Sequence, residues 1–228
     1  NYPFEEGIAF TVSTDEKVAF PFYLRIPSWT QKAEVRVNGK KVSAAPVAGK
    51  YLCINREWAN GDRVELTLPM SLSMRTWQVN KNSVSVDYGP LTLSLKIAEK
   101  YVEKDSRETA IGDSKWQKGA DPQKWPTTEI YPDSPWNYSL VLDKKEPLKN
   151  FKVIRKSWPA DNYPFTVASV PLEVKAIGRP VPEWKIDETG LCGVLPEEDA
   201  VKGDKEEITL IPMGAARLRI SAFPNTKE

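Results

Sequence analysis

Histidine is missing from the 228-residue sequence, and cysteine occurs only as Cys53 and Cys192. Histidine is the commonest general base and the commonest metal ligand in proteins, so its absence excludes Ser-His-Asp triads, Cys-His pairs and histidine-rich zinc sites. Two cysteines are also too few for a structural zinc site with four cysteine or histidine ligands. We therefore predict no catalytic residue, no metal site and no cofactor in this chain.

The two cysteines lie far apart, each inside an apolar stretch. This placement favours two buried free thiols over a single long-range disulfide. The chain opens on Asn1-Tyr2-Pro3-Phe4 with neither a methionine nor an apolar leader segment, so we expect it to be a part of a longer protein. The cellular compartment stays open.

An excess of charge and long apolar runs are missing too. Lys and Arg number 32 and Asp and Glu 31, which leaves a net charge of +1. Binding to a phosphate backbone requires a basic field that this balance does not supply, so we expect no nucleic-acid partner. Charge or proline interrupts every apolar stretch well before the ~20 residues that a transmembrane helix needs, and we expect no membrane span.

The first hundred residues contain short stretches of alternating apolar and polar side chains. Residues 18–27 and 64–69 show this period of two, which is typical of half-buried strands. Asn38-Gly39 accepts the positive φ angles of a type I′ hairpin turn, and Asn60-Gly61-Asp62 is a second turn signal. Strands at this spacing, without a sustained helical period, predict an antiparallel β-sandwich over residues 1–97.

The alternation stops at residues 98–136, which are rich in charge, proline and tryptophan. An irregular stretch of this length is usually a functional loop, a linker or a disordered segment, and its tryptophans argue against disorder. We predict an irregular linker or loop, whose first part, residues 99–109, allows a weak helix.

Alternation resumes in residues 137–228, which predicts a second β domain. The predicted fold class is therefore all-β, with two antiparallel β-sandwich-type domains joined by a long irregular segment. The acidic stretch 195–207 reads as a solvated loop. A glycosidase pair of carboxylates, which lie about 5–9.5 Å apart in such enzymes, is the alternative for this stretch.

The tryptophans fall into two groups. Trp29 and Trp58 lie next to predicted turns of the first domain, and we expect them to pack on its core. Trp116, Trp125 and Trp136 lie in or at the end of the irregular segment, where flat aromatic faces can bind sugar rings. They are therefore carbohydrate-binding candidates. The alternative, which the sequence favours, is that they anchor the segment on a neighbouring domain.

Several short motifs follow one another along nearly the whole chain. They are Leu24-Arg25-Ile26-Pro27-Ser28-Trp29, Val37-Asn38-Gly39, Tyr51-Leu52-Cys53-Ile54-Asn55-Arg56-Glu57-Trp58, Gly61-Asp62, Leu66-Thr67-Leu68-Pro69-Met70, Tyr88-Gly89-Pro90-Leu91, Ser134-Pro135-Trp136-Asn137-Tyr138, Leu210-Ile211-Pro212-Met213-Gly214 and Leu218-Arg219-Ile220-Ser221-Ala222-Phe223-Pro224. In this order and spacing they resemble the C-terminal region of family 127 glycoside hydrolases, the β-L-arabinofuranosidase-like enzymes of bacteria.

The resemblance implies a parent protein in which an N-terminal (α/α)6 barrel carries catalysis and β-sandwich domains follow it. The family's nucleophile is a cysteine in a zinc site of cysteines and a glutamate within the barrel, and neither Cys53 nor Cys192 matches that motif. We expect a non-catalytic structural and interdomain-packing region, with the barrel of the same parent chain as its partner. The alternative is a carbohydrate-binding module that recognises plant-type glycans through loop aromatics.

Overall fold

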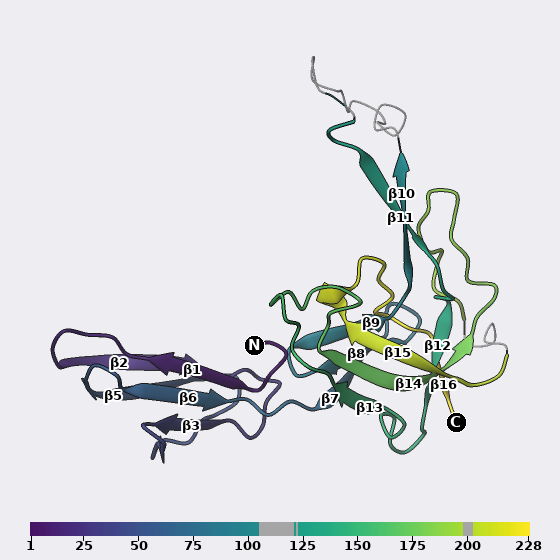
Figure 1. Ribbon diagram of the computed structural model, residues 1–228. Helices are drawn as coiled ribbons and strands as arrows, with labels where there is room; N and C mark the ends of the chain where they lie inside the picture. The colour runs from purple at the N-terminus through teal and green to yellow at the C-terminus, as the bar shows by residue number, and fades with distance from the viewer. Residues whose placement is uncertain (105–120, 122, 198–202) are drawn as a thin grey trace. The chain divides into compact units, whose positions relative to one another are not determined.

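The computed structural model describes residues 1–104, 121, 123–197 and 203–228. These residues form strands and connecting loops, with a single three-residue 3-10 helix at Met213–Ala215, which confirms the all-β prediction (Figure 1). Among them, no helix is long and apolar enough to cross a membrane. The chain divides into two compact units, residues 1–75 with 85–92 and residues 76–84 with 93–228.

The first unit contains two antiparallel sheets. One has the strand order β1–β6–β3–β4, and the other pairs β2 with β5 (Figure 1). The strands are β1 (Gly7–Thr11), β2 (Val18–Arg25), β3 (Glu34–Val37), β4 (Lys40–Lys41), β5 (Tyr51–Trp58) and β6 (Arg63–Thr67). Alternate residues of both sheets meet in one core, as a sandwich requires: Leu24, Ile26, Val35, Val37, Leu52, Trp58, Val64, Leu66 and Leu68.

Trp58 is the largest fully buried side chain of this core. Its indole N–H donates to the carbonyl oxygen of Phe20 at 2.9 Å, and the Phe20 and Phe22 rings each lie 5.7 Å from its ring. A tryptophan is buried at low cost when its indole N–H keeps a hydrogen bond, as it does here. Trp29 packs against the same cluster and is partly buried, so the predicted core placement of both tryptophans is confirmed.

The predicted hairpin turn is also present. Asn38 has φ of 52° and Gly39 φ of 76°, the positive values of a type I′ turn, and β3 pairs with β4 across them. The Asn38 amide then donates to the Asp62 carboxylate at 2.7 Å and ties this hairpin to the second predicted turn.

Asp62 accepts hydrogen bonds at the point where the two turns meet. The backbone N–H of Ala59 donates to it at 2.9 Å, and the Arg56 guanidinium lies 3.4 Å away. The Ala59 N–H and then the Asn38 amide hold the pKa of Asp62 below its usual range, with a smaller contribution from Arg56.

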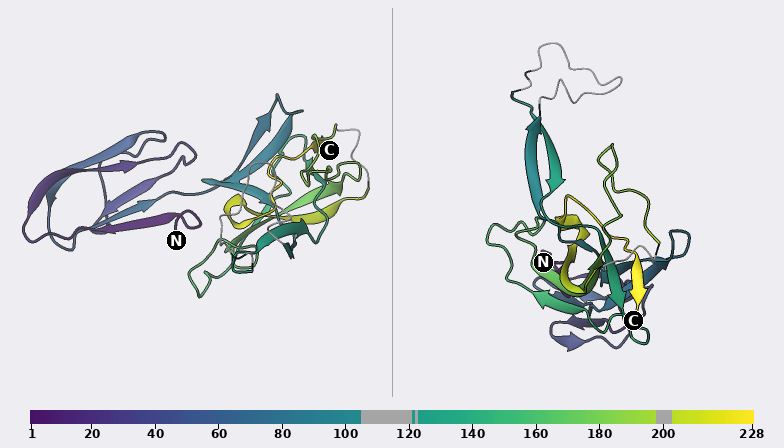
Figure 2. Two further views of the ribbon diagram at one scale, coloured as in Figure 1. Left: turned by 90° about the horizontal axis from the view of Figure 1, so that it is seen from above. Right: turned by 90° about the vertical axis from the view of Figure 1, so that its right-hand side faces the viewer.

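The main sheet of the second unit runs β16–β12–β14–β15–β9, with β13 also paired to β14 (Figure 1). Figure 2 shows these strands, coloured from teal to yellow, in two further views. The pairs within it are antiparallel except β12 with β16. The strands are β9 (Leu91–Leu95), β12 (Tyr138–Leu142), β13 (Lys152–Arg155), β14 (Leu172–Pro180), β15 (Glu206–Pro212) and β16 (Asn225–Lys227).

The connection between the units differs from the prediction. The chain passes between them inside β7 (Leu72–Trp77), β8 (Ser83–Tyr88) and β9, and not through an irregular segment at 98–136. The described residues of that segment belong to the second unit, where β10 (Glu99–Lys104) pairs with β11 (Thr127–Pro132) over six residue pairs.

The weak helix allowed for residues 99–109 is therefore wrong for Glu99–Lys104, and residues 105–109 lie outside the described part of the chain. A strand partner more than twenty positions away supplies the backbone hydrogen bonds here. Local propensity does not reveal such a partner.

The cysteines are free, as predicted, but the expected burial is wrong, since both are exposed. Cys53 alternates with the buried Leu52 and lies opposite Tyr23 on the outer face of the β2–β5 pair. Cys192 lies in a loop, where its backbone forms an isolated antiparallel β-bridge with Ile186. Successive side chains of a strand point to opposite faces, so the exposure of Cys53 depends on its position in the strand and not on its apolar sequence neighbours.

Gly89 is expected to be a sensitive position of the first unit. Its φ is +56°, and an added Cβ would lie 2.6 Å from Cγ and 3.1 Å from Cβ of the buried Met70. We expect Gly89→Ala to lower the free energy of unfolding by about 1–2 kcal/mol for the left-handed backbone and by about 1–3 kcal/mol more for overpacking. Urea unfolding measures the loss.

Gly39→Ala is the matched control in the same unit. Its φ is +76°, but nothing lies within 4 Å of an added Cβ, so only the backbone cost applies. Equal losses for the two variants would show that Met70 yields without cost and would contradict the packing argument.

The lowered pKa of Asp62 predicts that the first unit loses stability in acid. A carboxyl group whose pKa is lowered by folding stabilises the protein above its unfolded pKa of about 3.9, and this contribution disappears as the pH falls through the lower folded value. Asp62→Asn should therefore weaken the first unit at neutral pH and flatten its stability profile below about pH 4. Urea midpoints at neutral pH and below pH 4 test this, with Asp15→Asn, the same change at an exposed position, as the control.

Candidate functional site

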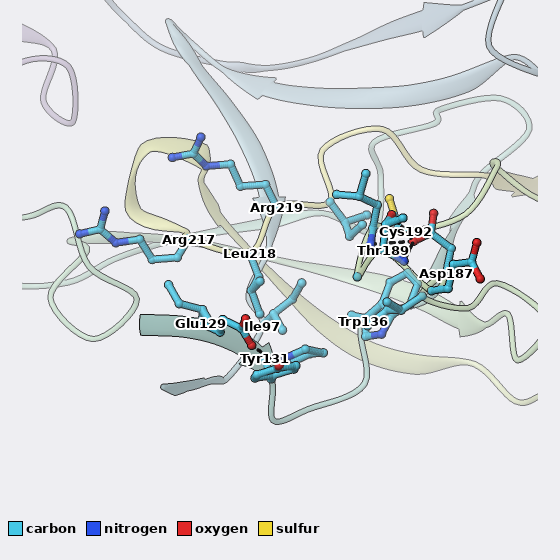
Figure 3. A pocket seen from close by; sticks show the side chains of 17 residues that line it. Ile97, Glu129, Tyr131, Trp136, Asp187, Thr189, Cys192, Arg217, Leu218 and Arg219 are labelled. Carbon is cyan, nitrogen blue, oxygen red and sulfur yellow. Dashed lines mark hydrogen bonds between the residues drawn. The ribbon is translucent and has the colours of Figure 1, made fainter. Parts of the chain in front are cut away.

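A cleft of about 800 Å³ opens within the second unit (Figure 3). This volume falls inside the range of about 300–1,000 Å³ that is typical of small-ligand sites. Its walls come from segments far apart in the sequence: residues 129–132 of β11, Trp136, the loop 186–192, and residues 217–220 with Ile97.

The loop 186–192 forms one wall and is held closed by Asp187. The backbone N–H of Asp187 donates to the Leu191 carbonyl at 2.8 Å. Its carboxylate accepts from the Thr189 hydroxyl at 2.6 Å and from the backbone N–H groups of Thr189 and Leu191 at 2.9 and 3.0 Å. The Thr189 hydroxyl, followed by the backbone amides, holds the pKa of Asp187 below its usual range. Asp187 is therefore an ionised cap of the loop.

Trp136 stands beside this loop, and its position is fixed from below by Trp184. The two rings meet edge to face, with centroids 5.2 Å apart. Trp184 is only 3% exposed, and its indole N–H donates to the Gly193 carbonyl at 3.0 Å. The side chain of Asn137 donates to the carbonyls of Val181 and Trp184 at 3.0 and 3.1 Å. Trp136 itself remains half-buried.

The segment 217–220 forms the opposite wall. The Arg217 backbone N–H donates to the Glu99 carboxylate at 2.9 Å. Ile220 is tied to the buried Ser94 hydroxyl through both its N–H and its carbonyl, at 3.0 and 3.1 Å. In Figure 3 the side chains of Arg217 and Arg219 extend away from Trp136, so positive charge gathers at one end of the cleft and the aromatic ring at the other.

Strand β11 contributes Glu129 and Tyr131 to the floor of the cleft. The Tyr131 hydroxyl donates to the Glu129 carboxylate, and this hydrogen bond raises the pKa of Tyr131. Tyr131 remains 42% exposed, so its ring is accessible from the cleft.

The cleft combines aromatic rings, guanidinium groups and carboxylates. It can therefore contact both apolar and hydrogen-bonding parts of a ligand. Asp187 and Glu129 already accept hydrogen bonds from the protein. In the described part of the chain, no group of three or more cysteine, aspartate or glutamate residues is placed to hold a metal ion.

The three tryptophans proposed from the sequence do not act as one set. Trp136 lines the cleft, whereas Trp125 is 71% exposed and is not part of its lining. Trp116 lies outside the described residues. Sequence reasoning missed Arg217 and Glu188 as lining residues, because no local motif marks positions that only the folded sheet brings together.

The described part of the acidic stretch 195–207 is solvent-exposed. Glu197 forms an ion pair with Lys81 at 2.8 Å, and Glu207 one with Lys175 at 3.0 Å. Both carboxylates are more than half exposed, which agrees with a solvated surface and gives no support to a catalytic pair.

Comparison with known proteins connects this fold to one class of enzymes. Residues 1–70 match the family model described as β-L-arabinofuranosidase, GH127 middle domain. A solved glycoside hydrolase shares 22% identity with a TM-score of 0.57, covering 99% of this chain and 31% of its own. No curated protein matches the sequence.

Two solved GH127 enzymes give the same result. A β-L-arabinofuranosidase from Geobacillus stearothermophilus has 22% identity and a TM-score of 0.56, covering 99% of this chain and 29% of its own. A further GH127 β-arabinofuranosidase has 19% identity and a TM-score of 0.56, with 99% and 30% coverage. The chain thus spans about three tenths of the length of these proteins.

The chain therefore has the fold of an all-β region found within longer glycoside hydrolases. Its resemblance to family 127 is confirmed: residues 1–70 match the GH127 middle-domain model, and the described chain shares the fold of part of the solved GH127 proteins.

Asp187 is predicted to hold the loop wall in place. Asp187→Ala removes the acceptor of three hydrogen bonds, so the loop should open more often and become a better protease substrate. Trypsin cleavage after Lys185 should be severalfold faster than in the unchanged protein. Glu188→Ala, one residue further along on the same loop, is the control and should leave the rate unchanged. Equal rates for the two variants would contradict the capping role.

Proposed function

We propose that this chain is the structural, interdomain-packing region of a GH127-type glycoside hydrolase and packs against an N-terminal (α/α)6 catalytic barrel of the same parent chain. The observation that carries the proposal is the match of residues 1–70 to a GH127 middle domain, together with coverage of only 29% to 31% of the longer relatives. A middle domain has further domains on either side of it in the chain, which favours a packing role.

The chemistry is assigned to the parent protein. The relatives' own descriptions name β-L-arabinofuranosidase activity, and we infer that the parent acts on β-L-arabinofuranosides or related sugars. The zinc and its cysteine ligands belong to the barrel in this proposal. Support for a non-catalytic role comes from the sequence, which offers no histidine as a general base.

The outer face of the β2–β5 pair is suited to packing against another domain. Tyr23 is 61% exposed and Tyr51 68% exposed, on adjacent strands whose inner faces already fill the core. Neighbouring exposed aromatic side chains are typical of surfaces that a partner covers, because they bury a large area at low conformational cost.

Thermal unfolding tests the packing role. A partner that binds only the folded state stabilises it, so the β units should unfold several degrees higher in the parent protein than in this chain alone. The double change Tyr23→Ser with Tyr51→Ser should reduce that difference, whereas Val47→Ser, a change of an exposed apolar residue elsewhere on the same unit, should not. Arabinose release from a β-L-arabinofuranoside should occur with the parent and not with this chain. Equal midpoints, or release by the chain alone, would contradict the proposal.

A further inference from the structure

The cleft of the second unit has fixed walls, which distinguishes it from a gap between mobile loops. Asp187 closes the loop 186–192, Trp184 supports Trp136, and the buried Ser94 hydroxyl holds Ile220 on both its backbone groups. Walls that are ordered before a ligand arrives reduce the entropy cost of binding.

The charges that line the cleft nearly cancel. Its lining contains two guanidinium groups, Arg217 and Arg219, and three carboxylates, Glu129, Asp187 and Glu188. A site for phosphate or for a nucleic-acid backbone requires a clear positive excess, and a site for a metal ion or cationic peptide requires a clear negative one. The cleft fits neither.

The lining of the cleft therefore fits a neutral ligand that has both apolar and hydroxyl-rich surfaces. Trp136 and Tyr131 offer partly exposed aromatic rings, and Ile97 and Leu218 extend the apolar wall between them (Figure 3). The Glu188 carboxylate can accept hydrogen bonds and the Arg217 guanidinium can donate them, and both residues line the cleft. Sugars present a C–H face to aromatic rings and hydroxyl groups that both donate and accept.

We propose that this cleft is a binding site for neutral oligosaccharides, in which a sugar ring packs on Trp136 and its hydroxyl groups contact Glu188, while Arg217 lies at the other end of the cleft. The site is independent of the packing role, because it lies wholly within the second unit. It differs from a surface row of loop tryptophans, because Trp125 takes no part in it.

The test is a titration of the 15N-labelled chain with arabinobiose, xylobiose and lactose, followed by NMR and calorimetry. The indole N–H signal of Trp136, assigned from Trp136→Phe, should shift saturably with at least one of the three sugars. Trp136→Ala should weaken binding at least ~10-fold, which corresponds to about 1.4 kcal/mol. Glu188→Gln, an exposed position, should weaken it severalfold without changing the unfolding midpoint.

Trp125→Ala is the matched control, since this tryptophan is exposed and outside the cleft lining. It should bind as the unchanged chain does. No saturable shift with any of the sugars at ~10 mM, a range that includes weak sites with Kd above 1 mM, would overturn the proposal. Equal losses for Trp136→Ala and Trp125→Ala, or binding of adenosine monophosphate in place of the sugars, would overturn it as well. None of these outcomes bears on the thermal test of domain packing.

Discussion

Strand β14 is the element on which the second unit depends. Strand β15 pairs along one of its edges, and β12 and β13 pair with successive parts of the other. Its alternate residues Leu172, Val174, Ala176 and Gly178 are all buried. Gly178 completes this row because an added Cβ would lie 3.0 Å from Ile208 and 3.3 Å from Tyr138. A close fit of three neighbours around one strand leaves little freedom in how the chain leaves that strand.

The position of the cleft depends on the path that the chain takes after β14. Beyond Pro180 the chain turns at Val181, whose backbone N–H donates to the Asn137 carbonyl at 2.7 Å. Trp184 comes next, buried beneath Trp136, and the loop that Asp187 closes follows it directly. The residue that supports the aromatic wall and the loop that forms the second wall thus follow one another directly after β14. Functional loops placed on a rigid sheet in this way are a common arrangement in proteins.

The sequence was most informative where a single strand or turn decides the structure. Alternation revealed the all-β class, and Asn38-Gly39 revealed its hairpin, because both signals are local. The exposure of Cys53 depends on strand parity and on its pairing with Tyr23, and the ribbon of Glu99–Lys104 depends on a distant partner. Such pairings are decided by tertiary packing and leave no mark on the residues nearby.

The candidate site shows the same division. Trp136 stood out because tryptophan in an irregular, charged segment is unusual, and it does line the cleft. Glu188, Arg217 and Ile97 carry no such signal, since charged and aliphatic residues occur throughout the chain. Only the sheet, which unites segments more than a hundred positions apart, makes them neighbours. A site assembled in this way can be found from coordinates but not from spacing in the sequence.

The family match ends at residue 70, but the physical unit does not. Residues 85–92 return to the first unit, where Gly89 lies against Met70 and the Arg75 guanidinium holds the Asp87 carboxylate through two hydrogen bonds of 2.6 and 2.9 Å. A bidentate pair of this kind is directional and fixes the return strand in register. The two units are therefore joined by strands that pass between them, and a cut after residue 70 would remove the cover of Met70. The boundary of the matched family segment and the boundary of the cooperative unit are different properties of this chain.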